Sequence, residues 1–369
     1  MKVCIIGGGN IGTAMAAIIA ERGHEVIIKT GKPERWSKNI IYTDSETGDC
    51  FSADLNLITD KAEDAASADV IFITVPSFSL KNVIEEIKPY IKPKTAIGII
   101  PGTGGVEFIL HPLIKEGFTI FGFDRVPCIS RVTEYGKKVS ASKKKSVRLA
   151  AFNCPDKKVL CNKMFDLLGV ECLELENYLT VTFTPSNPIL HTTRLYAMYQ
   201  GAAPSYSWPE NIPFYESWDN LSSEMLIKCD NELQGLCKKI DGLDLTGVIP
   251  LTIHYESPTV EAMTNKISNI PAFKGISSPM IEKDGRYFLD LNSRYFTEDF
   301  PYGLCIIKGF AEIFGYPVPN IDKVLKWYQD ISGKVYETET GFDGPDLKDT
   351  AVPQLYGIKT PEDVYSLYK

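Results

Sequence analysis

One histidine, His191, stands out among the side chains that could do acid–base chemistry. The chain has four histidines in 369 residues, and His191 lies in the segment "NPILH", Asn187 to His191. Asparagine is a favoured N-cap and proline suits the first helical position, so this segment predicts a helix start with His191 in its first turn. Hydride transfer to a C=O or C=N group needs an acid–base side chain with a pKa near neutrality, as histidine has. A lone histidine is more often structural, but a position just after a predicted sheet domain favours a catalytic one.

A carboxylate partner for this histidine is expected in the segment Asn292–Leu304. Here Thr297 is predicted as an N-cap, with Glu298 and Asp299 in the first helical turn. The helix dipole stabilises acids at that place, and such a carboxylate could fix the imidazole tautomer. Simple helix-end electrostatics would produce the same pattern, and the residues alone do not decide between Glu298 and Asp299.

A second group of chemically informative residues opens the chain. The glycines Gly7, Gly9 and Gly12 form a G-x-G-x-x-G pattern between a predicted strand, Val3–Ile6, and a predicted helix, Asn10–Arg22. The first glycine permits a tight turn, the second lets the backbone approach a pyrophosphate, and the third lets helix and strand pack closely. The helix N-terminus then faces the phosphates. This context predicts a dinucleotide site.

The end of the second predicted strand, Glu25–Lys29, indicates which dinucleotide is bound. An acid there would accept a hydrogen bond from the ribose 2′-hydroxyl of NAD. This chain instead continues with Thr30 and Lys32, and Arg35 follows closely. One hydroxyl and two cations would attract a 2′-phosphate, so we expect NADP. In the alternative, both cations are surface charges and NAD is used without the acid.

The elements that must position these residues alternate in the first 180 residues as in a doubly wound parallel sheet. The predicted strands are Val3–Ile6, Glu25–Lys29, Val70–Val75, Ala96–Ile100, Thr119–Phe123 and Val170–Leu175. The predicted helices are Asn10–Arg22, Ser79–Ile91, Val106–Glu116 and Lys157–Leu168, with a hairpin within Tyr42–Thr59. Loops after two strands carry Val75, Pro76 and Gly102, and they lie at the carboxyl edge where such sheets bind ligands.

After Pro185 helical patterns replace the strand rhythm. The predicted helices are Pro188–Gln200, Glu216–Lys239, Thr259–Ser268, Glu298–Phe314 and Ile321–Ser332. The sequence therefore predicts an N-terminal Rossmann domain, residues 1–184, and an all-helical domain, residues 185–369. The length also suits two domains.

Three motifs together resemble the octopine/nopaline (opine) dehydrogenase family. They are the glycine loop, "NPILH" at 187–191 and "RYFTEDFPYGL" at 294–304, and "TGKPERW" at 30–36 is similar to a segment of some members. The resemblance covers nearly the whole chain, and the last two of the three motifs are much more specific than the glycine loop. It implies a Rossmann domain followed by a helical domain of the 6-phosphogluconate-dehydrogenase-like type. It also implies NAD(P)H-dependent reductive condensation of an amino acid with a 2-oxo acid, such as pyruvate, through an imine to an N-(carboxyalkyl)amino acid, and the reverse oxidation.

The resemblance also assigns roles to residues. His191 resembles the catalytic acid–base and Asp299 the carboxylate of its dyad. Arg294 resembles the guanidinium that holds a substrate carboxylate, Asn187 an asparagine near the nicotinamide, and Arg131 an arginine of a P-x-x-x-R segment. In that segment Cys128 replaces the more usual aromatic residue. Residues expected at the cofactor are Gly7, Gly9, Asn10, Ile11, Gly12, Thr30, Lys32, Arg35, Val75, Pro76 and Gly102.

Two competing functions remain open. A ketopantoate-reductase-like or hydroxyacid dehydrogenase would reduce a 2-oxo acid alone, but such enzymes typically carry a lysine on the helix after the Rossmann domain. This chain has no lysine from Asn187 to Gln200. A non-catalytic NADP sensor would not need converging His, Asp and Arg side chains.

Composition limits the partners. The net charge of −8 offers no bulk attraction for a polyanion, and a basic cluster at 137–148 is predicted to be a solvated hairpin. No run of about 18 apolar residues indicates a membrane span. Nine scattered cysteines without a C-x-x-C pair favour reduced cytosolic thiols over a metal site or disulfides. We expect a cytoplasmic enzyme with small-molecule substrates, no metal, no nucleic acid and no membrane, and a homodimer is left open.

Overall fold

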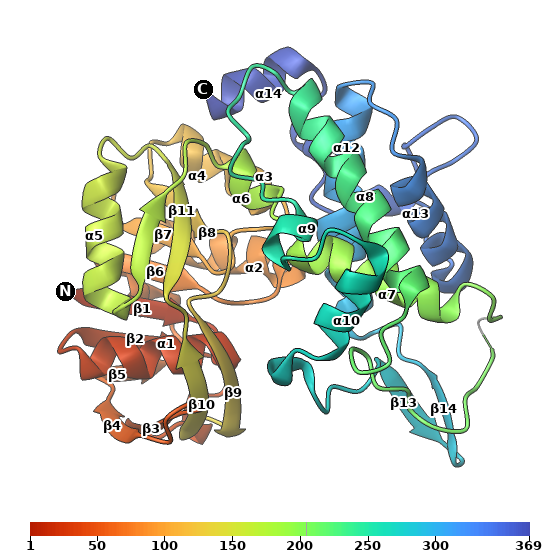
Figure 1. Cartoon of the computed structure of the whole chain (residues 1–369). Helices are drawn as coiled ribbons and strands as arrows, with labels where there is room; N and C mark the ends of the chain where they lie inside the picture. Colours follow the sequence, from red (N-terminus) through yellow and green to blue (C-terminus); the bar gives the residue numbers. More distant parts are fainter. Residues whose placement is uncertain (204) are drawn as a thin grey trace. The chain divides into compact units, whose positions relative to one another are not determined.

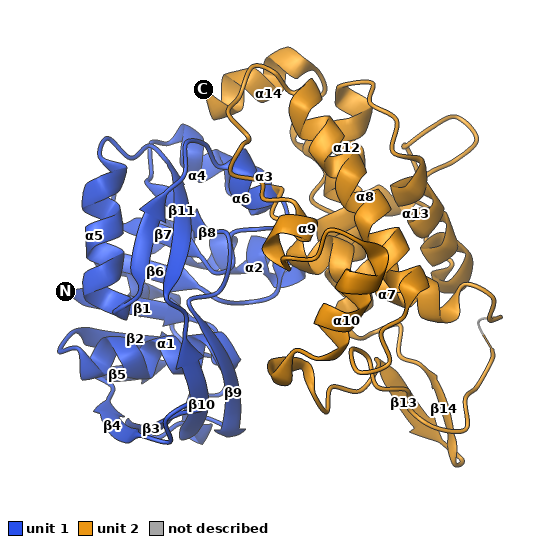
Figure 2. Cartoon of the chain, in the orientation of Figure 1, with its two compact units in different colours: residues 1–182 blue, residues 183–369 orange. Residues whose placement is uncertain are grey.

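The computed structural model describes residues 1–203 and 205–369, which divide into two compact units (Figures 1 and 2). Unit 1 is Met1–Thr182 and unit 2 is Phe183–Lys369. The division falls close to the boundary expected after Thr184. No helix in the part of the chain that the structure describes is long and apolar enough to cross a membrane.

Unit 1 is built on an eight-stranded sheet in the order β12-β11-β8-β7-β6-β1-β2-β5. The strands are β1 Lys2–Ile6, β2 Glu25–Lys29, β5 Leu57–Thr59, β6 Val70–Ile73, β7 Ala96–Ile99, β8 Ile120–Phe123, β11 Ser146–Phe152 and β12 Glu171–Glu174. All neighbours are parallel except β11 against β8. Every residue of β6, β7 and β8 is buried, as expected of parallel strands that are covered on both faces. The predicted doubly wound sheet is confirmed.

The helices of unit 1 connect these strands. They are α1 Asn10–Glu21, α2 Ser77–Ile87, α3 Val106–Ile109, α4 His111–Lys115, α5 Lys157–Leu168 and α6 Leu179–Thr182. Helix α1 is buried without interruption from Gly12 to Ile19, because it packs against the main sheet and a second, smaller sheet. The predicted helix Val106–Glu116 is divided in two, with Pro112 in the first turn of α4.

The smaller sheet has four strands in the order β4-β3-β10-β9. Its strands are β3 Asn39–Asp44, β4 Cys50–Asp54, β9 Cys128–Glu134 and β10 Lys138–Lys143. Strands β3 and β4 form a hairpin that overlaps the one predicted within Tyr42–Thr59, but it starts at Asn39, and Leu57–Thr59 forms β5 of the main sheet. The prediction of one solvated hairpin at 137–148 is wrong, because β10 joins the small sheet and β11 joins the main sheet.

Unit 2 is mainly helical, as predicted, with one added hairpin. Its helices are α7 Ser186–Tyr199, α8 Asn220–Lys239, α9 Leu251–His254, α10 Val260–Ser268, α11 Arg294–Thr297, α12 Cys305–Ile313, α13 Pro319–Ser332 and α14 Pro361–Tyr368. The hairpin is β13 Met280–Lys283 with β14 Arg286–Leu289. Helix α7 packs against α8, and α13 packs against both.

Stacked aromatic rings fix the segment after α11 inside unit 2. Phe300 stacks on Tyr328 of α13 with ring centroids 4.0 Å apart, and Phe296 lies parallel to both rings. Both phenylalanines are fully buried. Burial of one such ring contributes about 1.5–3 kcal/mol, so the two rings hold the residues between them, Thr297 to Asp299, in place.

Candidate active site

His191 lies in the second turn of α7 rather than in its first. The helix begins at Ser186 with Pro185 as its N-cap residue, so the expectation that Asn187 is the N-cap is wrong. Pro188 is tolerated because the first-turn N–H groups have no partner inside the helix. The helix therefore starts two residues earlier than expected, and the side chain of His191 is 13% exposed.

Asp299 reaches His191 from an irregular turn, not from a regular helix start. The expectation that Thr297 is an N-cap is wrong, since Thr297 is the last residue of α11. A π-helical turn, Phe300–Leu304, follows, and the Leu304 N–H donates to the Asp299 carbonyl at 2.9 Å. Wide turns of this kind are frequent at functional sites because they re-aim side chains.

The imidazole of His191 has a hydrogen-bond partner on each ring nitrogen. Its Nδ1 lies 2.7 Å from Asp299 Oδ2, across 108 residues of chain. Its Nε2 lies 2.8 Å from the hydroxyl of Tyr215. An ionised Asp299 accepts the Nδ1 proton, which leaves Nε2 of the neutral ring as an acceptor. The structure therefore pairs Asp299, not Glu298, with this histidine.

Two tyrosines complete the polar group, and neither was anticipated from the sequence. Tyr215 is buried, and the ring of Tyr295 lies 4.6 Å from the imidazole centroid. Burial, more than any other cause, raises the pKa of both phenols, and the charge of Asp299 raises them further. Both phenols therefore stay neutral around pH 7 and act as hydrogen-bonding groups. Tyr215 lies between α7 and α8 in a segment without helical or strand periodicity, which explains why no sequence pattern marks it.

The three residues that the resemblance assigns to substrate binding are all exposed, two in unit 2 and one in unit 1. Arg294 is the first residue of α11, five positions before Asp299, and its side chain is exposed. Asn187 is exposed in the first turn of α7, four positions before His191. Arg131 is exposed on β9 in unit 1. Asn187 thus shares α7 with His191, and Arg294 opens α11, which ends two residues before Asp299.

The glycine loop in unit 1 has the backbone that the sequence predicts. Gly7 has φ of +116°, which L side chains rarely adopt. A Cβ on Gly12 would lie 1.9 Å from the Gly7 carbonyl oxygen, so only glycine allows α1 to pack on β1 here. Gly9 is the N-cap of α1, provides no side-chain cap, and faces open space. These features leave the first-turn N–H groups of α1 for an anion.

The neighbouring residues of this loop have structural partners as well. The side-chain Oδ1 of Asn10 accepts a hydrogen bond at 2.8 Å from the Val132 N–H of β9. Ile11 packs against the hydrophobic core. Val75 and Pro76 are half-buried between β6 and α2. Gly102 is buried, and a Cβ there would lie 2.6 Å from Gly122, so packing alone already requires this glycine.

Two of the three residues expected at a 2′-phosphate, Thr30 and Arg35, contact the side chain of Tyr135. Thr30 follows β2, and its hydroxyl lies 3.3 Å from the Tyr135 hydroxyl. The Arg35 guanidinium lies 4.8 Å from the centroid of the same ring, a cation–π contact. Lys32 is exposed, and its N–H donates to the Thr30 hydroxyl at 3.4 Å. Thr30, Lys32 and Arg35 thus form one polar cluster beside the glycine loop.

No cluster suited to a metal ion exists within residues 1–203 and 205–369: no three His, Cys, Asp or Glu side chains there are placed to share one.

Comparison with known proteins gives both halves of the chain a relative. A family model described as "NAD/NADP octopine/nopaline dehydrogenase, alpha-helical domain" matches residues 174–332. A model described as "Ketopantoate reductase PanE/ApbA" matches residues 3–134. Tauropine dehydrogenase of Arabella iricolor is 29% identical over 400 residues, which cover 98% of each chain.

Solved structures of octopine dehydrogenase are similar over the full length. The complex with NADH and L-arginine is 25% identical, with a TM-score of 0.87 over 100% of this chain and 98% of that chain. The complex with NADH and pyruvate is 26% identical, with the same TM-score and coverage. The similarity therefore includes both units.

Proposed function

This chain belongs to the octopine/nopaline (opine) dehydrogenase family, and on that premise we propose how its residues carry out the reaction. The protein is an NAD(P)-dependent oxidoreductase that acts on CH–NH groups. It condenses an amino acid with a 2-oxo acid through an imine and reduces the product to an N-(carboxyalkyl)amino acid. It also catalyses the reverse oxidation.

The observation that carries this proposal is the contact of 2.7 Å between His191 and Asp299. Condensation needs an acid–base group twice, because the attacking amine must lose a proton and the carbinolamine hydroxyl must gain one before water leaves. One imidazole can do both in succession, since its ordinary pKa is near neutrality. Asp299 would hold the ring in one tautomer and stabilise its protonated form.

Arg294 is proposed to hold a carboxylate of the substrate. Both substrates of this reaction carry a carboxylate, and the planar guanidinium binds such a group through two parallel hydrogen bonds. Its exposed place at the start of α11 leaves it accessible. Asn187 is proposed near the nicotinamide, and Arg131 is proposed to contribute to substrate binding.

The glycine loop fits a dinucleotide. Gly9 would admit a pyrophosphate at a place that a larger side chain would fill, and α1 offers uncapped N–H groups to it. The bound cofactor supplies the hydride. The residues proposed to hold it are those of the glycine loop, Gly7 to Gly12, with Val75, Pro76 and Gly102.

We propose NADP rather than NAD as the preferred cofactor. The cluster of Thr30, Lys32 and Arg35 supplies a hydroxyl and two cations where NAD-binding folds carry an acid. All nine cysteines are free of disulfides, which suits the proposed cytoplasmic location.

The test is an assay of NADPH oxidation with amino acids and 2-oxo acids offered separately and together. We expect oxidation only when both are present, and mass spectrometry should find the secondary amine. The match of residues 3–134 to ketopantoate reductase favours one alternative, the reduction of a 2-oxo acid alone. Oxidation without an amino acid would establish that alternative, and NADPH binding without turnover would instead make the protein a sensor.

A further inference from the structure

The hydroxyl of Tyr215 occupies the ring nitrogen of His191 that Asp299 leaves free. From this contact and its supports we propose that Tyr215 is a positioning residue of the reaction. Its hydrogen bond to Nε2 holds the imidazole in line with Asp299 before the substrates bind. When they bind, a substrate group replaces the phenol at Nε2. This inference rests on the proposed function, since it assigns a partner to the same histidine.

Tyr215 is held rigidly enough for such a role. Its ring stacks on Phe273 with centroids 4.1 Å apart, and it lies parallel to Trp218 at 6.3 Å. Phe214 packs edge-on against it at 4.9 Å. With neighbours on several sides and 4% of its surface exposed, the phenol has little freedom to turn away from His191.

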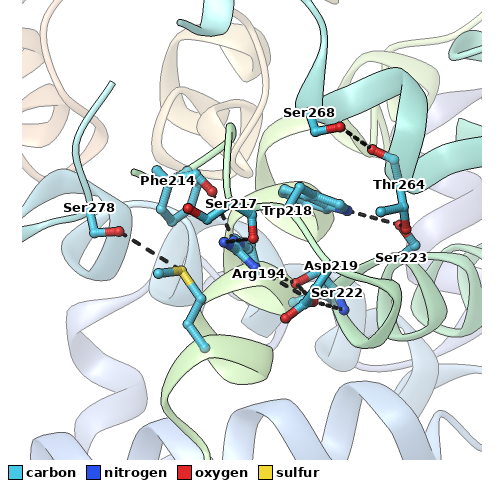
Figure 3. A network of polar contacts seen from close by, with 12 residues as sticks. Arg194, Phe214, Ser217, Trp218, Asp219, Ser222, Ser223, Thr264, Ser268 and Ser278 are labelled. Atoms are coloured by element: carbon cyan, nitrogen blue, oxygen red, sulfur yellow. Dashed lines mark hydrogen bonds and ion pairs between the residues drawn. The ribbon is translucent and has the colours of Figure 1, made fainter. Parts of the chain in front are cut away.

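Arg194 fixes the segment that carries Tyr215. Figure 3 shows its guanidinium amid Phe214, Ser217, Ser222 and Asp219. It donates to the carbonyls of Phe214 at 2.9 Å and Ser217 at 2.7 Å, which flank Tyr215 in sequence.

The same guanidinium also donates to the Ser222 hydroxyl at 2.9 Å, at the start of α8. Arg194 is 1% exposed and stands three residues after His191 on α7. One rigid helix therefore carries both the imidazole and the group that fixes its phenol partner.

Tyr215 also has a second polar neighbour, so its hydroxyl can release Nε2 without being left unpaired. The phenol of Tyr295, which adjoins Arg294 in sequence, lies beside the same imidazole and interacts with Tyr215 electrostatically. A buried hydroxyl without a partner would be strongly unfavourable. Because Tyr295 stays available, Tyr215 can give up Nε2 to a substrate and remain satisfied.

The phenol can serve both protonation states of the ring. Next to neutral His191 the Tyr215 O–H donates to Nε2, and next to the imidazolium its oxygen accepts the Nε2 proton. The titratable groups that face the imidazole are Asp299, Tyr215 and Tyr295, and Tyr255 acts on Tyr215 electrostatically. The hydrogen bond from the imidazolium is the stronger of the two, because its donor is charged.

The experiment compares Tyr215→Phe with Tyr196→Phe. Tyr196 is a matched control, since it lies on α7, is equally buried and donates one hydrogen bond, to Gln200 at 2.8 Å, away from the dyad. We expect Tyr215→Phe to lower kcat about tenfold, the effect of one lost hydrogen bond of about 1.4 kcal/mol, with KM nearly unchanged.

The pH profile of kcat/KM should change too, because it reports groups of the free enzyme. Without the phenol oxygen, the limb that reports the imidazole should move to lower pH by about half a unit to one unit. Tyr196→Phe should keep wild-type kcat and the wild-type profile. Arg194→Lys keeps the charge but loses the planar guanidinium that donates to several groups at once, so it should reproduce part of the Tyr215→Phe effect.

Several results would overturn the proposal. One is a Tyr215→Phe enzyme with wild-type kcat and pH profile, and another is a fall in kcat with an unmoved profile, which would mark a purely structural role. If Tyr215→Phe does not fold, Tyr295→Phe takes its place, and it should lower kcat and move the same limb less. His191→Asn separates the two proposals, because an active His191→Asn enzyme refutes the proposed function itself.

Discussion

The glycine loop of unit 1 and the imidazole site of unit 2 are assembled over very different lengths of chain. Gly7, Gly9 and Gly12 lie in one strand-to-helix turn, where Gly12 packs on Gly7, both lie against Thr74 after β6, and Gly9 faces open space. His191, Tyr215 and Asp299 come from three segments, and the histidine is 24 residues from the tyrosine and 108 from the carboxylate.

Because one site is local and the other is assembled from distant segments, the two should respond differently to substitutions. The loop depends on backbone geometry, which a single added carbon can destroy. The imidazole site depends on supports such as Arg194 and the stacked rings Phe296, Phe300 and Tyr328. If the two sites are independent, substitutions in the glycine loop should weaken cofactor binding alone, and substitutions at the imidazole site should lower the rate of catalysis alone. A substitution that affects both would contradict this independence.

The largest effect is expected for His191→Asn. Imine reduction should fall by about 10²–10⁴, the usual contribution of general acid–base catalysis. NADPH affinity, measured by fluorescence titration, should stay at the wild-type value because the glycine loop is untouched. Turnover near the wild-type rate would remove His191 from the mechanism.

Gly12→Ala should damage the other site. Its Cβ would lie 1.9 Å from the Gly7 carbonyl oxygen, and overpacking of this kind costs about 1–3 kcal/mol, so NADPH affinity should fall roughly 5–150-fold. The melting temperature should fall as well.

Gly9→Ala is the informative companion to Gly12→Ala, because no atom lies within 4 Å of a Cβ on Gly9. It should keep the wild-type melting temperature and still weaken NADPH binding, since the added methyl group would meet the pyrophosphate. Wild-type NADPH affinity in Gly9→Ala would show that the cofactor does not approach this residue.

Arg294→Lys should raise KM for a carboxylate substrate about tenfold, because the charge remains while the two parallel hydrogen bonds are lost. Steady-state kinetics with each substrate varied in turn measures this. Weakened NADPH binding with unchanged substrate dependence would move Arg294 to the cofactor site.

The smallest effect concerns the cluster at Thr30. The wild type should prefer NADPH over NADH by about tenfold or more, and Lys32→Ala should reduce that ratio severalfold, since charge-assisted bonds are worth about 1.5–3 kcal/mol before solvent losses. Thr30→Asp should weaken NADPH and improve NADH. The ratio should also shrink as salt rises, because charges are screened over about 8 Å at physiological ionic strength.

Lys38→Ala is the control for this cluster, since Lys38 is an exposed cation on the same stretch of chain. The preference of Lys38→Ala for NADPH over NADH should match that of the wild type. An unchanged ratio in Lys32→Ala, with equal use of NADH, would mean that Lys32 is only a surface charge and that the NADP assignment fails.

Much of unit 1 follows from the sequence alone, for a local reason. A parallel strand that is covered on both faces must be apolar throughout, and a tight strand-to-helix turn needs glycines at fixed spacing, so β6 and the loop at Gly7–Gly12 can be recognised from neighbouring residues. The basic segment 137–148 could not be placed in the same way. Its two strands belong to different sheets: β10 pairs with the adjacent β9 and with the distant β3, whereas β11 pairs with β8.

In unit 2 the sequence predicted helices near α7, α8, α10, α12 and α13, but not α9, α14 or the β13–β14 hairpin. It also predicted a dyad of His191 with an acid of the 298–299 pair. The family resemblance favoured Asp299, whereas the residues by themselves left Glu298 and Asp299 open. The tertiary structure brought Asp299 to His191, beside a π-helical turn that packs against α13. It also brought Tyr215 to the second ring nitrogen, through a buried arginine and stacked rings. Periodicity and capping act over a few residues, whereas a contact across 108 residues forms only when the core closes.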